Sequence, residues 1–131
     1  MSSNPSEQLF LEGPRVAAKL SAVDGALVVD VNLLIDTGAD QSVLDVDIVE
    51  SLGSVAIRET EIAGVTSAPL TCPVHRVHLT LLGRTFEVDA VVLPRAGVGD
   101  DGLLGRDVLQ ALRFVYDGHA GTFALEPATE G

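Results

Sequence analysis

The sequence is poor in aromatic and in basic residues. Only 4% of its 131 residues are aromatic and none is Trp, while 47% are hydrophobic. A core must therefore be built from Val, Leu, Ile and Ala, and β-branched cores favour strands. Eight Lys and Arg stand against 19 Asp and Glu, which gives a net charge of −11. Nucleic acids and anionic membranes are bound through positive patches, so we expect neither as a partner.

Cysteine and long apolar runs are also scarce. Cys72 is the single cysteine, so an intrachain disulfide or a cysteine-based metal site is excluded. The histidines and the acidic clusters lack metal-ligand spacing, and we expect no metal and no cofactor. No apolar run approaches the ~20 residues that span a bilayer. The N-terminus also lacks a basic region followed by an apolar stretch, so we expect a cytoplasmic protein.

The length suits one domain, and we expect a flexible N-terminal segment over 1–8 and a single domain over 9–131. Short apolar-alternating segments are separated by Gly and Pro turns, which is typical of an all-β barrel-like domain. Pro69 and Pro73 argue against a central strand near them. We expect strands over 16–20, 26–35, 58–62, 77–81, 86–92 and 121–125, with turns at 24–25 and 116–118. We also expect short helices that begin at Asp45 and, with Asp107 as N-cap, over 108–112.

The stretch LLIDTGADQSVL, from Leu33 to Leu44, places Asp36 between aliphatic residues and a Gly turn. The preceding residues alternate, with Val29 and Val31 on the same strand face as Leu33. Burial of an unpaired carboxylate is very costly. Asp36 is therefore either a turn aspartate that accepts local N–H bonds, or a carboxylate whose setting serves chemistry.

A second stretch, GLLGRDVL, from Gly102 to Leu109, has two apolar residues and a Gly ahead of a short helix. Together and in this order, the two stretches resemble the active-site signatures of the retropepsin-like (retroviral-type) aspartic proteases, particularly small bacterial members. The resemblance runs from about Leu27 to Leu125. It implies a single-lobe β-barrel with one or two short helices, and hydrolysis of peptide bonds by two aspartates that hold one water between them, without a cofactor.

The sequence holds Asp36-Thr37-Gly38 and no second copy of that motif. If the resemblance holds, the second aspartate is Asp36 of another copy, and the protein works as a homodimer on a peptide or protein substrate. The 121–125 strand is a candidate for the dimer interface. The catalytic residues implied are Asp36, Thr37 and Gly38; the substrate-binding residues are Ala39, Asp40, Ile62, Ala63, Gly64, Val65, Thr66 and Leu103; the residues that support the site are Gly105, Arg106 and Asp107.

Several of these roles are specific enough to be tested. The Thr37 hydroxyl would hydrogen-bond across the dyad, and Gly38 could accept a substrate amide. Asp40 would form an ion pair with Arg106. The 62–66 segment would be a flap that closes over substrate. Its aliphatic residues suggest apolar side chains at the cleaved bond.

A second class of function stays open. A retropepsin-like fold could be catalytically silent and serve as a dimerisation or peptide-binding module, because fold does not determine function. A serine hydrolase is not expected, since Ser42 lies in no nucleophile-elbow pattern. His75 shares an apolar face with Val77 and Leu79, and we expect it to be a hydrogen-bonded core or edge histidine.

Overall fold

The computed structural model of the protein describes residues 4–62, 68–94 and 101–128. Short strands account for most of it, with three short helices in the described ranges. The elements are α1 (Pro5–Glu12), β1 (Arg15–Ala22), β2 (Val28–Ile35), β3 (Val43–Asp45), α2 (Val46–Ser51), β4 (Ala56–Ile62), β5 (Leu70–Leu81), β6 (Arg84–Leu93), β7 (Gly102–Leu104), α4 (Arg106–Leu109), β8 (Leu112–Asp117) and β9 (Thr122–Pro127).

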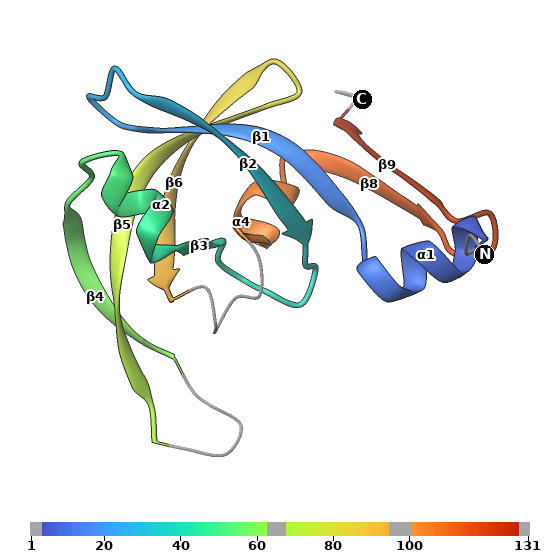
Figure 1. The fold of residues 1–131 in the computed structure, drawn as a ribbon, viewed down its shortest axis with the longest axis horizontal. Coiled ribbons are helices and arrows are strands. Elements are labelled where there is room, and N and C mark those ends of the chain that lie inside the picture. Colours follow the sequence, from blue (N-terminus) through green and yellow to red (C-terminus); the bar gives the residue numbers. More distant parts are fainter. Residues whose placement is uncertain (1–3, 63–67, 95–100, 129–131) are drawn as a thin grey trace.

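Six strands close into a barrel. The main sheet has the order β1-β2-β7-β3-β6-β5-β4, and an additional pairing of β1 with β5 joins its ends. β4 stays outside the closure as an edge strand on β5, and the two extend away from the barrel as a ribbon (Figure 1). β8 and β9 form a separate two-stranded sheet, with α1 at one end (Figure 1). The predicted all-β barrel with short helices is confirmed.

The barrel core follows from alternation along its strands. In β2, Val31, Leu33 and Ile35 are buried, whereas Asp30 and Asn32 are exposed, as predicted. The opposite face of the β5–β6 pair carries a second cluster, which we call the small core. Its buried members are Cys72, Val74 and Val91, and Val43, Ile62 and Leu93 pack against them.

Both predicted hairpins form. β1 and β2 pair along their length on either side of Asp24-Gly25, and Gly25 N donates to Ala22 O at 3.0 Å. β5 and β6 are joined through Leu82 and Gly83, whose φ angles of 55° and 74° are left-handed, as a two-residue type I′ turn requires.

The N-terminal expectation is wrong for residues 5–8. They belong to α1, which Asn4 caps by accepting a hydrogen bond from Glu7 N at 2.8 Å. Pro5 occupies the first turn, where its missing N–H costs nothing. The Ser6 hydroxyl donates to Gly118 O at 2.6 Å and fastens the helix to the β8–β9 turn. Asn followed by Pro is a signal for the start of a helix, but the polar composition of residues 1–8 favoured a flexible segment instead.

Three further expectations need correction. Pro73 lies in an interior strand, but the β5–β6 ladder begins only at Val74, so Pro73 has a strand neighbour on the β4 side alone. The second helix is α4 (Arg106–Leu109) with Gly105 at its N-cap, so Asp107 lies inside the first turn. Residues 112–117, expected partly as helix and partly as turn, form β8.

His75 is 8% exposed and hydrogen-bonded to Ser54 Oγ at 3.0 Å, which confirms the predicted core histidine. Burial lowers the pKa of its ring, and the nearby Glu50 carboxylate opposes that shift. None of the helices in the described ranges is long and apolar enough to cross a membrane.

Candidate active site

Asp36 directly follows the last residue of β2, where the chain turns at the surface of the barrel. Its backbone N–H donates to Leu104 O at 2.9 Å, so the end of β7 holds the turn in place. Asp36 Oδ1 accepts from Gly38 N at 2.9 Å, and Asp36 O accepts from Ala39 N at 3.2 Å. The side chain is half-buried. In the part of the chain that the structure describes, that bond from Gly38 is the one hydrogen bond made by this carboxylate.

The second sequence signature lies against the first. Arg106 N donates to Ala39 O at 2.8 Å, and its guanidinium donates from Nη1 to Thr37 O at 2.7 Å. Gly105 allows this approach, because a Cβ there would lie 2.7 Å from the Gln41 carbonyl carbon and 3.0 Å from Ala39 O. Only a residue without a side chain lets the two loops come this close.

The predicted Asp40–Arg106 ion pair is wrong. Arg106 donates to the Thr37 carbonyl instead, and no ion pair joins Asp40 to Arg106 among the described residues. The loop points the Thr37 carbonyl toward α4, and the guanidinium of Arg106 donates to this oxygen at 2.7 Å. Asp40 is left exposed beside the loop.

Ser42 is a support of the site that sequence reasoning missed. It is 2% exposed, and its Oγ accepts from Gly105 N at 3.0 Å while donating to Asp107 Oδ1 at 2.8 Å. Ser42 N also donates to Asp107 Oδ2 at 2.9 Å. Asp107 thus anchors the end of the Asp36 loop to α4. In the sequence, Ser42 is a single small polar residue directly before the apolar pair Val43-Leu44. Such a pattern alone does not indicate that the Ser is buried.

A hollow of about 440 Å³, which we call the site groove, lies between this loop and β4. It brings together three of the predicted substrate-binding residues, Ala39, Asp40 and Ile62. Leu103 is half-buried in β7 and does not line it. Predicted residues 63–66 lie outside the described residues. The lining is Ala39, Asp40, Gln41, Val43, Thr60, Glu61, Ile62 and Val91.

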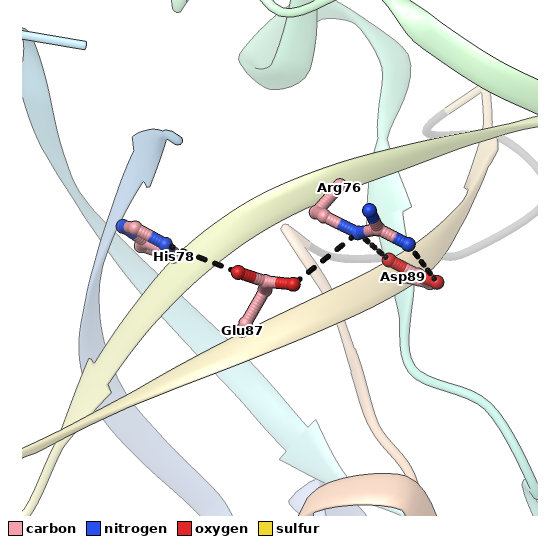
Figure 2. Close-up of polar contacts among 4 residues, drawn as sticks. All are labelled: Arg76, His78, Glu87 and Asp89. Atoms are coloured by element: carbon pink, nitrogen blue, oxygen red, sulfur yellow. Dashed lines mark hydrogen bonds and ion pairs between the residues drawn. The ribbon is translucent and has the colours of Figure 1, made fainter. Parts of the chain in front are cut away.

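A row of charged side chains runs along the outer face of β5 and β6 (Figure 2). Arg76 donates to both Asp89 oxygens, at 2.7 and 3.1 Å, and its Nε lies 3.4 Å from Glu87 Oε1. His78 Nε2 lies 3.8 Å from the other Glu87 oxygen. The hydrogen bond from Arg76 lowers the pKa of Asp89. Within the described ranges, no group of three or more His, Cys, Asp and Glu side chains could hold a metal ion.

The chain was compared with known proteins. A family model described as aspartyl protease matches residues 21–108, more than half of the chain. No match was found among curated proteins. The retroviral protease-like domain of Ddi1 from Leishmania major is 16% identical, with a TM-score of 0.50, over 78% of this chain and 80% of that one. The EIAV protease complexed with the inhibitor HBY-793 is 25% identical, with a TM-score of 0.48, over 74% of this chain and 85% of that one. The chain therefore belongs to the aspartyl protease family.

Proposed function

We propose that the protein is an aspartic endopeptidase that is active as a homodimer, with Asp36 of each copy contributing to one shared site. Two carboxylates a few ångströms apart hold one proton between them, as aspartic-protease dyads do generally. The ionised member takes a proton from the bound water, and the protonated member donates to the carbonyl oxygen of the peptide bond.

The setting of Asp36 is the observation that carries this proposal. Asp36 Oδ1 accepts a local hydrogen bond from Gly38 N, as a turn aspartate does, but Oδ2 accepts no hydrogen bond within the described residues. Its backbone is meanwhile held by Leu104 and, through Ala39, by Arg106. The backbone therefore holds this carboxylate in place, while few hydrogen bonds within the described part of the chain occupy its oxygens. Such a carboxylate is suited to interact with a water, a substrate or a second copy of the chain.

The site groove supports a peptide substrate. Its walls are the loop that follows Asp36 and the edge strand β4, and Val43, Ile62 and Val91 make part of its surface apolar. We propose that the ribbon of β4 and β5, with the 62–66 segment, closes over an extended peptide in this groove, with Ala39 and Asp40 on the opposite wall. Apolar side chains near the cleaved bond would pack on the aliphatic surface.

Subunit mixing tests the shared site. Wild-type protein is mixed with an equal amount of the Asp36→Asn variant, above the dimer dissociation constant and after exchange of subunits, and peptide cleavage is followed. Because mixed dimers would lack one acid, total activity should fall to about half that of the wild type alone. Unchanged activity would place the complete site within one chain. The Asp36→Asn variant alone should be inactive.

Two further results bear on the proposal. Hydrolysis should be fastest at acidic to mildly acidic pH, because the state that shares one proton must be populated. A rate that climbs steadily into the alkaline range would contradict the dyad. A folded wild-type dimer that cleaves nothing in a broad peptide library would instead favour the silent binding module.

A further inference from the structure

Arg58 stands out among the few basic residues of this acidic chain. All of the eight Lys and Arg except Arg95 lie in the described ranges, and nearly all of these are engaged. Arg58 is the exception, since it makes no hydrogen bond or ion pair in the described part of the chain. The engaged residues are Lys19 with Asp30, Arg76 with Asp89, Arg113 with Glu126, Arg106 with Thr37 O, Arg84 with Ala111 O and the Phe86 ring, and Arg15.

The strand register turns Arg58 toward the active site. Residues directly opposite in an antiparallel pair point to the same side of the sheet. Arg58 pairs with Val74, two positions along from Thr60, which pairs with Cys72. Val74 and Cys72 are buried in the small core beneath the site groove. Arg58 therefore shares the face of β4 that carries the groove-lining residues Thr60 and Ile62.

Arg58 borders a second hollow, of about 320 Å³, which we call the charged hollow. Gln41 lines both hollows, and β4 lines both as well, through Arg58 in one and Thr60 to Ile62 in the other. The two hollows thus follow one another along the inner face of β4. Ile62 lies four positions along the strand from Arg58, which is about 13 Å at the usual rise per residue.

The carboxylates of the charged hollow already have partners. Asp89 accepts two hydrogen bonds from Arg76, and Glu87 lies between Arg76 and His78 (Figure 2). Asp107 accepts from Ser42. The positive charge of Arg58 is felt there, because it adds to the stronger effect of Arg76 in lowering the pKa of Asp89. Among the charged side chains of this hollow, Arg58 is the one that makes no hydrogen bond or ion pair within the described residues, so its guanidinium donors are open to a ligand.

We propose that Arg58 binds an acidic side chain of the substrate. In an extended peptide, this acidic residue would lie about four positions from the residue that packs beside Ile62. A guanidinium offers a planar pair of N–H donors that match a carboxylate. The substrate class is then a peptide with an apolar residue at the site groove and a Glu or Asp at the charged hollow. This inference rests on the proposed function, since it takes the site groove as the peptide-binding site.

Paired peptides provide the test. In a series based on one cleaved peptide, Glu replaces Gln at one position at a time, and kcat/KM is measured for each pair. Wild-type protein should prefer Glu at one position by roughly twofold to fivefold, as expected of an exposed charged pair, and mainly through KM. The preference should shrink as salt is raised.

Variants of Arg58 assign the preference to this side chain. Arg58→Gln should bring the Glu/Gln ratio to about one, Arg58→Lys should retain part of it, and Arg58→Glu should prefer Lys at the same position. Lys19→Gln is the matched control, because it removes one positive charge from β1, where Lys19 is paired with Asp30. That control should keep the wild-type ratio. A ratio of one in the wild type, or a ratio that survives Arg58→Gln, would overturn the inference.

A binding arm separates this inference from the proposed function. Fluorescence anisotropy of labelled Glu and Gln peptides is measured with the Asp36→Asn variant and with Asp36→Asn/Arg58→Gln. Tighter binding of the Glu peptide that needs Arg58 would support the subsite even if the wild type cleaved nothing, a result that would refute only the endopeptidase proposal. Cleavage without any contribution from Arg58, in either arm, would refute the subsite and leave the endopeptidase standing.

Discussion

Replacement of Ser42 by Ala should destabilise the protein more than its modest chemistry suggests. Ser42 is 2% exposed, and its Oγ joins the Gly105 N–H to the Asp107 carboxylate. The Ala variant deletes both bonds and leaves the Gly105 N–H in a buried position without an acceptor. An unsatisfied buried donor costs about 1–3 kcal/mol, and the bond to the exposed carboxylate adds about 1 kcal/mol. We expect the free energy of unfolding to fall by about 2–4 kcal/mol.

Urea denaturation at one protein concentration measures this change, since the stability of a dimer depends on concentration. Ser51→Ala is the matched control. Ser51 is exposed and donates to Ile48 O within α2, so its loss should cost less than about 0.5 kcal/mol. Hydrogen exchange adds a local readout, because the Gly105 amide should be protected in the wild type and should exchange faster in Ser42→Ala. Equal costs for the two Ser variants, with unchanged exchange at Gly105, would refute the role assigned to Ser42.

Further substitutions test the rest of the site and the core. Gly105→Ala would place a Cβ 2.7 Å from the Gln41 carbonyl carbon, so we expect the free energy of unfolding in urea to fall by over about 2 kcal/mol. Gly53→Ala is the control, because φ is 72° there but nothing lies within 4 Å, and it should cost less. A greater loss of stability at Gly53 would contradict this account. Burial lowers the pKa of His75, so the unfolded chain binds more protons as the pH falls below about 6.5. Stability should therefore decline below that pH, and less steeply in His75→Gln; parallel pH profiles of unfolding would show that His75 is not responsible. Asp36→Asn should leave the free energy of unfolding within about 0.5 kcal/mol of wild type while cleavage falls at least about a hundredfold; full turnover would eliminate the dyad.

Local patterns were sufficient to predict most of the barrel. The β5–β6 hairpin follows from period-two alternation on both sides of a two-residue turn, and Gly83 supplies the left-handed conformation that such a turn needs. The same holds for β2, whose buried and exposed residues alternate as expected. These signals are short in sequence, so no knowledge of distant partners is needed to interpret them.

Contacts between distant segments were harder to predict. The Asp40–Arg106 pair was expected because the family resemblance implied it, but Arg106 has the Thr37 carbonyl within reach and donates to it. Ser42 and Asp107 are 65 positions apart, and only the closed barrel shows that their bonds hold the two signatures together. Sequence limits which groups can pair, whereas the fold decides which acceptor is nearest.

The two walls of the site groove are held in different ways. On the acid side, Asp36 is tied to Leu104, Ala39 to Arg106, and Ser42 to Asp107, so strand and helix ends from the barrel fix the loop in place. The opposite wall is β4, an edge strand whose ladder bonds go to β5 alone. Catalysis needs the carboxylate in one position, and entry of a peptide needs a wall that separates from it. The fold would suit both demands, because residues 70–73 of β5 pair with β4 alone and this outer part of the ribbon makes none of the hydrogen bonds that position Asp36.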